Sequence, residues 1–205
     1  MPRLSLQREQ VKEFLARHGM ARLTELHEIG ATSVTVSRME QDGELIRLSR
    51  GLYQMADAPL DTNHALAEAA KRVPKGVMCL VSALAFHELT DQLPRKVWVA
   101  IGQRDWKPVV DRPLLRVVRF SDKLLSDGVE SHSIEGVDVR IFDIPKTIAD
   151  CFRHRSTVGL AVAIEGLQEA LRQRKATPSE IVQSAARGGG ASVIRPYLEA
   201  LTANG

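Results

Sequence analysis

The pattern of apolar and polar positions predicts three short helices at the start of the chain. Between residues 6 and 18, apolar side chains recur at helical spacing and would share one side of an amphipathic helix: Leu6, Val11, Phe14 and Leu15. Ser5 is the expected N-cap of this helix, and Gly19 is expected to end it because glycine readily adopts a positive φ. A second helix is expected over residues 22–28, and a third over residues 33–41 after Thr32 as its cap.

Two short β-prone stretches follow the third helix. Residues 44–48 and 51–54 are joined by Ser49-Arg50-Gly51, which predicts a β-hairpin with a tight turn. Three short helices followed by a hairpin form the outline of a winged helix-turn-helix domain. Because Asp57-Ala58-Pro59 is typical of a linker, we expect this domain to comprise residues 1–58.

The pattern changes from His64 onward, where helices alternate with apolar strand candidates. Helices are expected over 64–73, from about Ser82, and over 144–154, and three more close the chain over 159–174, 177–187 and 192–201. Strands are expected over 96–101 and 114–120, and a hairpin over 129–142 that turns at Gly136. The predicted fold class is therefore α+β, with a winged helix-turn-helix followed by a mixed α+β domain of residues 62–205 whose C-terminal part is helical.

Composition places the chain among ordinary globular proteins. It is 44% hydrophobic and 26% charged, and no stretch approaches the ~18 consecutive apolar residues of a membrane span. The first ten residues have no apolar segment of the kind a secretion signal contains, so we expect a cytoplasmic protein. Cys79 and Cys151 lie in apolar runs without metal-ligand spacing, so we expect both to be buried and no metal or cofactor to be bound.

The charges are unevenly distributed along the chain. The formal net charge is +3, yet residues 1–60 contain eight basic and eight acidic side chains and are neutral overall. The region after residue 150 contains seven basic and four acidic side chains, so it accounts for the whole net charge. Phosphate binding benefits from clustered Lys and Arg. DNA binding by the first domain would therefore depend on a few locally segregated arginines.

The third helix and the hairpin carry the candidate DNA-binding residues. In a helix-turn-helix, the second of the two helices enters the major groove. Val36 and Met39 are expected to face the core, so that Ser33, Thr35, Ser37 and Arg38 would face outward. The expected DNA-binding set adds the helix cap and two wing arginines: Thr32, Ser33, Thr35, Ser37, Arg38, Arg47 and Arg50. Such residues also occur on any solvated helix, and many winged-helix domains bind only proteins, so both interpretations stay open.

Catalytic motifs are scarce in the second domain. His87 and His132 could titrate near neutral pH, but no nucleophile elbow, P-loop or GxGxxG accompanies them. A metal-dependent nuclease is an alternative, with Asp138, Asp143 and Lys146 as its site, although Asp143 more simply caps the helix 144–154. We therefore expect no enzyme. Trp98 is expected in the core and Trp106 at an exposed interface.

Several segments resemble the AbiEi-type antitoxins of type IV (abortive-infection) toxin–antitoxin systems. Residues 32–54, TSVTVSRMEQDGELIRLSRGLYQ, resemble the winged-helix region of that family. The later segments that carry the resemblance are CLVSALAFHELTDQLPRKVWVAI, LLRVVRFS, GVESHSIEGVDVRIFDIPKTIADCFRHR, VGLAVAIEGLQEALRQRKATPSEI and VIRPYLEAL. The resemblance thus extends from about Leu6 to Leu201.

The resemblance implies a repressor that binds double-stranded DNA at inverted repeats in its own promoter. It places the DNA contacts on the third helix and the wing, and it implies that the C-terminal domain counteracts a nucleotidyltransferase-type toxin. The resemblance implies no catalytic residues. The neutral N-terminal domain departs from more basic family members, and two copies on paired half-sites would compensate. A ligand-responsive winged-helix transcription factor is the alternative from a different class.

Overall fold

A computed structural model describes residues 2–202, with side chains from residue 5 to residue 201. Its contacts divide the chain into two compact units. The N-terminal unit comprises the chain up to Pro74 together with Pro108–Pro113 and His132–Val139, and the C-terminal unit comprises the remainder. The expected division into domains of residues 1–58 and 62–205 stays a prediction.

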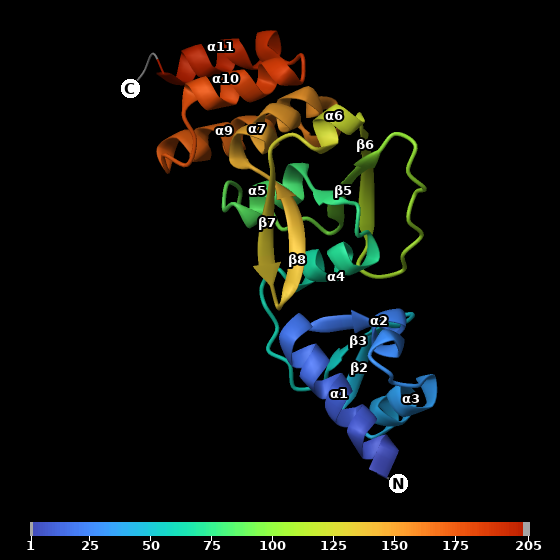
Figure 1. Ribbon diagram of the computed structural model, residues 1–205. Helices are drawn as coiled ribbons and strands as arrows, with labels where there is room; N and C mark the ends of the chain where they lie inside the picture. The colour runs from blue at the N-terminus through green and yellow to red at the C-terminus, as the bar shows by residue number, and fades with distance from the viewer. Residues whose placement is uncertain (1, 203–205) are drawn as a thin grey trace. The chain divides into compact units, whose positions relative to one another are not determined.

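The N-terminal unit contains a winged helix (Figure 1). Its elements follow one another as α1 (Pro2–His18), β1 (Met20–Arg22), α2 (Leu23–Glu28), α3 (Ser33–Gln41), β2 (Leu45–Ser49) and β3 (Leu52–Met55). The three strands form an antiparallel sheet in the order β1-β3-β2. This sequence of helices and strands confirms the predicted winged helix-turn-helix. Helix α4 (His64–Arg72) also belongs to this unit.

Two local predictions in this unit were wrong. Helix α1 begins at Pro2, so Ser5 lies inside the helix and is not its cap; proline at the first helical position fits because its missing N–H would have no helical partner. Arg22 belongs to a short strand, in which Met20 pairs with Gln54 and Arg22 with Leu52. Strand β1 is defined by its pairing with β3, a contact that is distant in sequence.

The C-terminal unit is a mixed sheet covered by helices (Figure 1). Its sheet has the order β6-β5-β4-β8-β7, with β4 antiparallel to β5 and parallel to β8, and β5 parallel to β6. The strands of this sheet are β4 (Val77–Met78), β5 (Val97–Gly102), β6 (Leu115–Phe120), β7 (Val129–Ile134) and β8 (Val137–Phe142). The part of the β7–β8 hairpin from His132 to Val139 is grouped with the N-terminal unit. The helices are α5 (Leu80–Phe86), α6 (Asp122–Leu125), α7 (Ile144–Arg153), α8 (Arg155–Val158), α9 (Leu160–Arg172), α10 (Pro178–Arg187) and α11 (Ala191–Thr202). The predicted α+β class and the helical C-terminal part are confirmed.

Helix starts in the C-terminal unit follow the expected capping rules. The Asp143 carboxylate accepts a hydrogen bond of 2.7 Å from the Lys146 backbone N–H and caps α7, with Pro145 in the first turn. At the start of α10, Thr177 and Glu180 form a reciprocal capping box. These two starts were visible in the sequence because capping is a local interaction.

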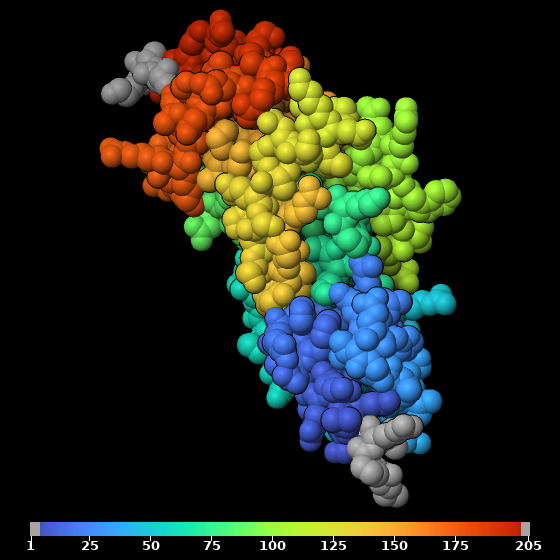
Figure 2. Space-filling model, viewed as in Figure 1, coloured from blue at the N-terminus to red at the C-terminus, as the bar shows by residue number. Residues whose placement is uncertain are grey.

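The core of the C-terminal unit confirms several single-residue predictions. Cys79 and Cys151 are both fully buried, and burial raises the pKa of each thiol, which keeps both protonated and unreactive. Trp98 is buried in β5, whereas Trp106 is 91% exposed. Trp106 lies in the segment after β5, which Figure 2 shows at the surface in light green. No helix among the described residues is long and apolar enough to cross a membrane.

Candidate nucleic-acid interface

The turn between α2 and α3 is built by a glycine, a cap and a shared core. Gly30 has a φ of +90°, and Thr32 then caps α3 by accepting a hydrogen bond of 3.2 Å from the Thr35 backbone N–H. Leu26 of α2 and Val36 of α3 are buried in the same apolar cluster. The turn is therefore fixed at both ends, which gives α3 one orientation relative to α2.

One face of α3 is exposed. At about 100° per residue, positions 34, 37, 38 and 41 share a stripe, and all four side chains are exposed: Val34, Ser37, Arg38 and Gln41. Ser33 and Thr32, at the beginning of the helix, are exposed too. Of the residues predicted to face outward, Ser33, Ser37 and Arg38 do so. The sequence interpretation overlooked Val34 and Gln41, although their spacing from Ser37 and Arg38 places them on the same stripe.

Thr35 was wrongly predicted to face outward. Its exposed fraction is 0%, because it lies one turn before Met39 and shares the buried side of the helix. Its hydroxyl donates to Oε1 of Gln7 in α1 and also contacts the Thr32 hydroxyl at 3.0 Å. Thr35 thus anchors α3 to α1, and its polar group is used inside the protein.

The wing consists of β2, β3 and the turn between them. Gly51 supplies the positive φ of +70° that the turn requires, and the pairing of β2 with β3 shifts register between Arg47 and Ser49. Arg47 and Arg50 are both exposed. The two predicted wing arginines are thus available to a ligand.

Helix α4 holds the wing from one side. The Arg72 guanidinium donates from Nη1 to the Arg50 carbonyl oxygen at 2.8 Å and from Nη2 to the Ser49 hydroxyl. Glu68, one turn earlier, is only 7% exposed. Its pKa is raised, because the effect of burial outweighs the opposing effect of the nearby His64 and Arg72. Sequence reasoning missed these two hydrogen bonds because no local pattern relates residues 49–50 to residue 72.

Ion pairs separate the basic side chains of this unit into two groups. On α1, Arg8 pairs with Asp42 and with Glu44, the latter at 2.8 Å, and Lys12 pairs with Glu44 at 3.0 Å. Arg17, also on α1, pairs with Glu13. Over the part of the chain that the structure describes, no ion pair engages the three arginines of the α3 face and the wing: Arg38, Arg47 and Arg50. Residues 1–60, which are neutral overall, thus keep three arginines outside the ion pairs of the described residues, on α3 and the wing.

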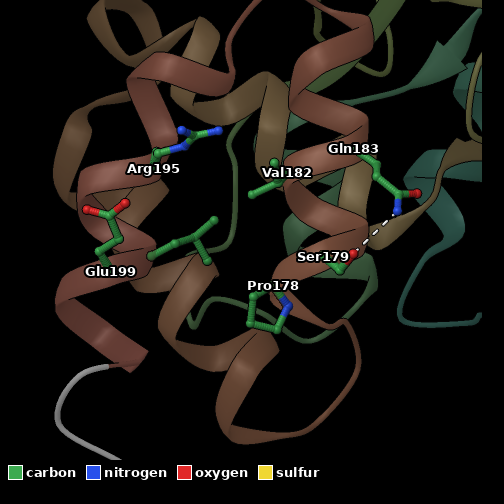
Figure 3. A pocket seen from close by; sticks show the side chains of 7 residues that line it. Pro178, Ser179, Val182, Gln183, Arg195 and Glu199 are labelled. Carbon is green, nitrogen blue, oxygen red and sulfur yellow. Dashed lines mark hydrogen bonds between the residues drawn. The ribbon is translucent and has the colours of Figure 1, made fainter.

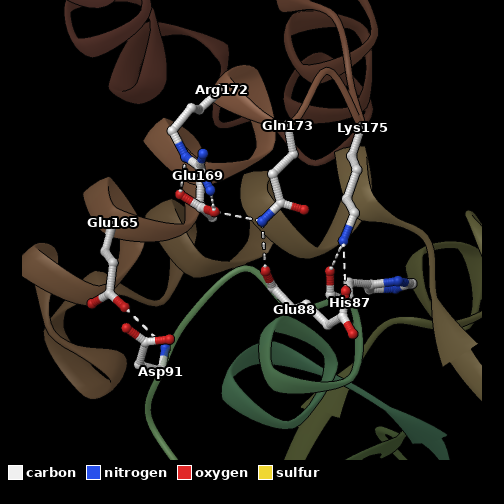
Figure 4. A network of polar contacts seen from close by, with 8 residues as sticks. All are labelled: His87, Glu88, Asp91, Glu165, Glu169, Arg172, Gln173 and Lys175. Carbon is white, nitrogen blue, oxygen red and sulfur yellow. Dashed lines mark hydrogen bonds and ion pairs between the residues drawn. The ribbon is translucent and has the colours of Figure 1, made fainter.

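His87, the catalytic candidate of the C-terminal unit, has structural partners, and so does the hydroxyl of Ser82. Nε2 of His87 lies 2.8 Å from the Phe142 carbonyl oxygen, and the His87 carbonyl accepts a hydrogen bond from Nζ of Lys175, as Figure 4 shows. Ser82 accepts a hydrogen bond of 2.9 Å from the Trp98 backbone N–H. These interactions tie helix ends and strands together.

The residues of the nuclease alternative are also occupied. Lys146 is 2% exposed and pairs with Asp150 inside the core, and Asp143 caps α7. Asp138 is exposed on β8. Among the described residues there is no group of three or more His, Cys, Asp or Glu side chains that could hold a metal ion. The interactions of Lys146 and Asp143 therefore favour structural roles.

A shallow groove of about 370 Å³ lies between α10 and α11 (Figure 3). Its walls include Pro178, Val182 and Leu198, with Arg195 and Glu199 at its rim. One carboxylate and one guanidinium do not indicate a particular class of ligand, and this groove therefore does not indicate a catalytic centre.

Comparison with known proteins bears on the N-terminal unit most directly. Residues 9–56 match the sequence model of a family described as "Transcriptional regulator, AbiEi antitoxin". The chain is also similar in structure to the solved RV2827C protein from Mycobacterium tuberculosis, with a TM-score of 0.55 and 13% identity over 94% of this chain and 80% of that one. At this identity the likeness concerns the fold alone. No curated protein matches the chain.

The family match spans α2, α3, and the wing, the elements that carry the exposed arginines. It supports function as a transcriptional regulator and antitoxin of an abortive-infection system, which is a regulatory rather than an enzymatic role. Over residues 9–56, the chain thus matches the AbiEi antitoxin family of transcriptional regulators, and the predicted resemblance is confirmed for this segment.

Proposed function

We propose that the protein is an autorepressor that binds double-stranded DNA at inverted repeats in its own promoter through α3 and the wing. The observation that carries this proposal is the set of three exposed arginines that form no ion pair with any described residue, Arg38, Arg47 and Arg50, within the segment that matches a regulator family. Arginine suits both phosphate oxygens and the O6/N7 edge of guanine. Ser37 lies on the exposed stripe with Arg38, and Thr32 and Ser33 lie at the N-terminus of the same helix.

The neutral charge of residues 1–60 determines what kind of DNA binding is expected. A broad basic surface would bind any DNA strongly at low salt, whereas three arginines form only a few phosphate contacts per copy. Two copies on paired half-sites would double these contacts and match the two-fold symmetry of an inverted repeat. Binding is therefore expected to depend on a repeated site.

The DNA claim is tested by fluorescence anisotropy with the duplex that precedes the protein's own coding sequence, at several salt concentrations. Each arginine that contacts a phosphate contributes about 0.9 to the slope of log affinity against log salt. Arg38→Ala and Arg50→Ala should weaken binding. Arg17→Ala is the matched control, because Arg17 is exposed on α1 and already paired with Glu13. Equal affinities for all four proteins would contradict the proposed interface.

We further propose that the protein counteracts a nucleotidyltransferase-type toxin as the antitoxin of a type IV system. Several cations of the C-terminal unit are already paired, Lys175 with Glu88 and Arg187 with Asp127 among them, which does not favour a broad basic surface for an acidic partner. Antitoxicity without a stable complex is therefore the form we propose. Growth of cells that express such a toxin from the neighbouring gene tests it. Rescue by wild type and by the Arg38→Ala/Arg50→Ala variant alike would separate antitoxicity from DNA binding, and absence of rescue by wild type would contradict it.

A further inference from the structure

We infer that Val34 is a sequence-reading residue that contacts the 5-methyl group of a thymine in the major groove. This inference rests on the proposed DNA binding by α3 and names one chemical feature of the site. Val34 is 58% exposed, whereas Thr35 and Val36, which follow it in the helix, are buried. A branched apolar side chain is thus presented to solvent in the first turn of the second helix of a helix-turn-helix.

The polar groups around Val34 are already engaged within the protein. The Ser33 hydroxyl lies 3.0 Å from Nε2 of His27, which links α3 to α2. The Thr32 hydroxyl caps the helix, and the Thr35 hydroxyl donates to Gln7. Among residues 32–35, Thr32 and Ser33 are exposed but use their hydroxyls within the protein, and Thr35 is buried. Val34 is exposed and presents only apolar atoms to solvent.

The position of Val34 in α3 indicates which kind of ligand group it contacts. Base edges are read by residues near the N-terminus of the recognition helix. Val34 shares its stripe with Ser37 and Arg38, one turn further along, and Arg38 has no ion pair among the described residues. A free cation beside the apolar group fits an anionic duplex rather than an apolar protein surface. The apolar feature of a base edge in the major groove is the thymine methyl, so Val34 and Arg38 together favour a thymine close to a guanine.

The test begins with selection of binding sites by the full-length protein from a pool of random-sequence duplexes. Each thymine of the selected duplex is then replaced in turn by deoxyuridine, which removes the methyl group and keeps every hydrogen bond. For wild type, one such replacement should weaken binding about fourfold, the value expected when one buried methyl group is lost.

Two variants turn this measurement into a double-mutant cycle. Val34→Ala should weaken binding to the thymine duplex and should bind the thymine and deoxyuridine duplexes equally. Val109→Ala is the matched control, because Val109 is 91% exposed and lies outside α3. It should retain the fourfold preference of wild type.

The outcomes distinguish this inference from the proposed function. Tight binding of a selected site with no effect of any deoxyuridine, or an unchanged preference in Val34→Ala, overturns the role of Val34 and leaves DNA binding intact. Failure of the protein to enrich any duplex from the pool overturns both.

Discussion

The Arg72 guanidinium donates a hydrogen bond of 2.8 Å to the carbonyl oxygen of Arg50, so the last turn of α4 fixes the backbone of the wing turn. The donor interacts with the backbone and with the Ser49 hydroxyl, and it leaves the Arg50 side chain exposed. The wing arginine is thus held in place by a residue that need not contact DNA itself.

We predict that Arg72→Leu weakens DNA binding by loosening the wing without removing a phosphate contact. Amide hydrogen exchange in residues 49–51 should become faster, because two hydrogen bonds to the turn are lost. Affinity should fall at every salt concentration, while the salt dependence stays that of wild type. Arg50→Ala, in contrast, should reduce the slope by about 0.9. A reduced slope in Arg72→Leu would mean that Arg72 itself contacts phosphate.

Glu68 predicts a dependence of stability on pH. Burial raises its pKa above the usual value of 4.5, against the opposing influence of His64, the Ser49 hydroxyl and Arg72. The folded state therefore binds the proton more tightly than the unfolded chain. Stability from this group is fully present below the unfolded pKa and is lost as pH rises through the raised folded value. Glu68→Gln should remove this loss.

Urea unfolding at pH 4 and at pH 7 measures the effect. The free energy of unfolding of Glu68→Gln, relative to that of wild type, should be higher at pH 7 than at pH 4. Glu9→Gln is the matched control, since Glu9 is exposed on α1. An equal difference between Glu68→Gln and wild type at both pH values would contradict the prediction.

The sequence predicted features that depend on local chemistry. The Thr32 and Asp143 caps, the Gly136 turn and the inward side of Val36 and Met39 all follow from helical spacing, capping or turn chemistry, and the structure has them. Each involves residues within about one turn of one another.

Some of the features that were missed depend on contacts distant in sequence. Thr35 was predicted to face outward although it lies four residues before the buried Met39, and its contact with the distant Gln7 shows how its hydroxyl is satisfied inside the protein. The hydrogen bond from Arg72 to the Arg50 carbonyl oxygen likewise joins segments more than twenty residues apart. Lys146 differs, since Asp150 lies four residues later on the same helix and was a local signal for an ion pair.

The Lys146–Asp150 pair provides the last prediction. Both side chains are buried, and the ammonium lies 4.5 Å from the ring centre of Phe142 and 4.9 Å from that of Phe120. Burial raises the pKa of Asp150, while Lys146 and Arg153 oppose that change. Lys146→Met should lower the free energy of unfolding by about 3–5 kcal/mol, because it removes the close partner of a buried carboxylate and leaves Asp150 only the more distant Arg153, at 3.9 Å.

The double variant Lys146→Met/Asp150→Leu should recover much of this loss, because it removes both charges and keeps apolar volume in the core. Lys175→Ala breaks the partly exposed Lys175–Glu88 pair and is the control, with an expected cost below about 1 kcal/mol. Urea unfolding of wild type, Lys146→Met, Asp150→Leu and the double variant gives the coupling free energy of the buried pair. A double variant as unstable as Lys146→Met would show that the aliphatic stem of Lys146 and its contacts with the phenylalanine rings, rather than the charge of its partner, account for the stability at this position.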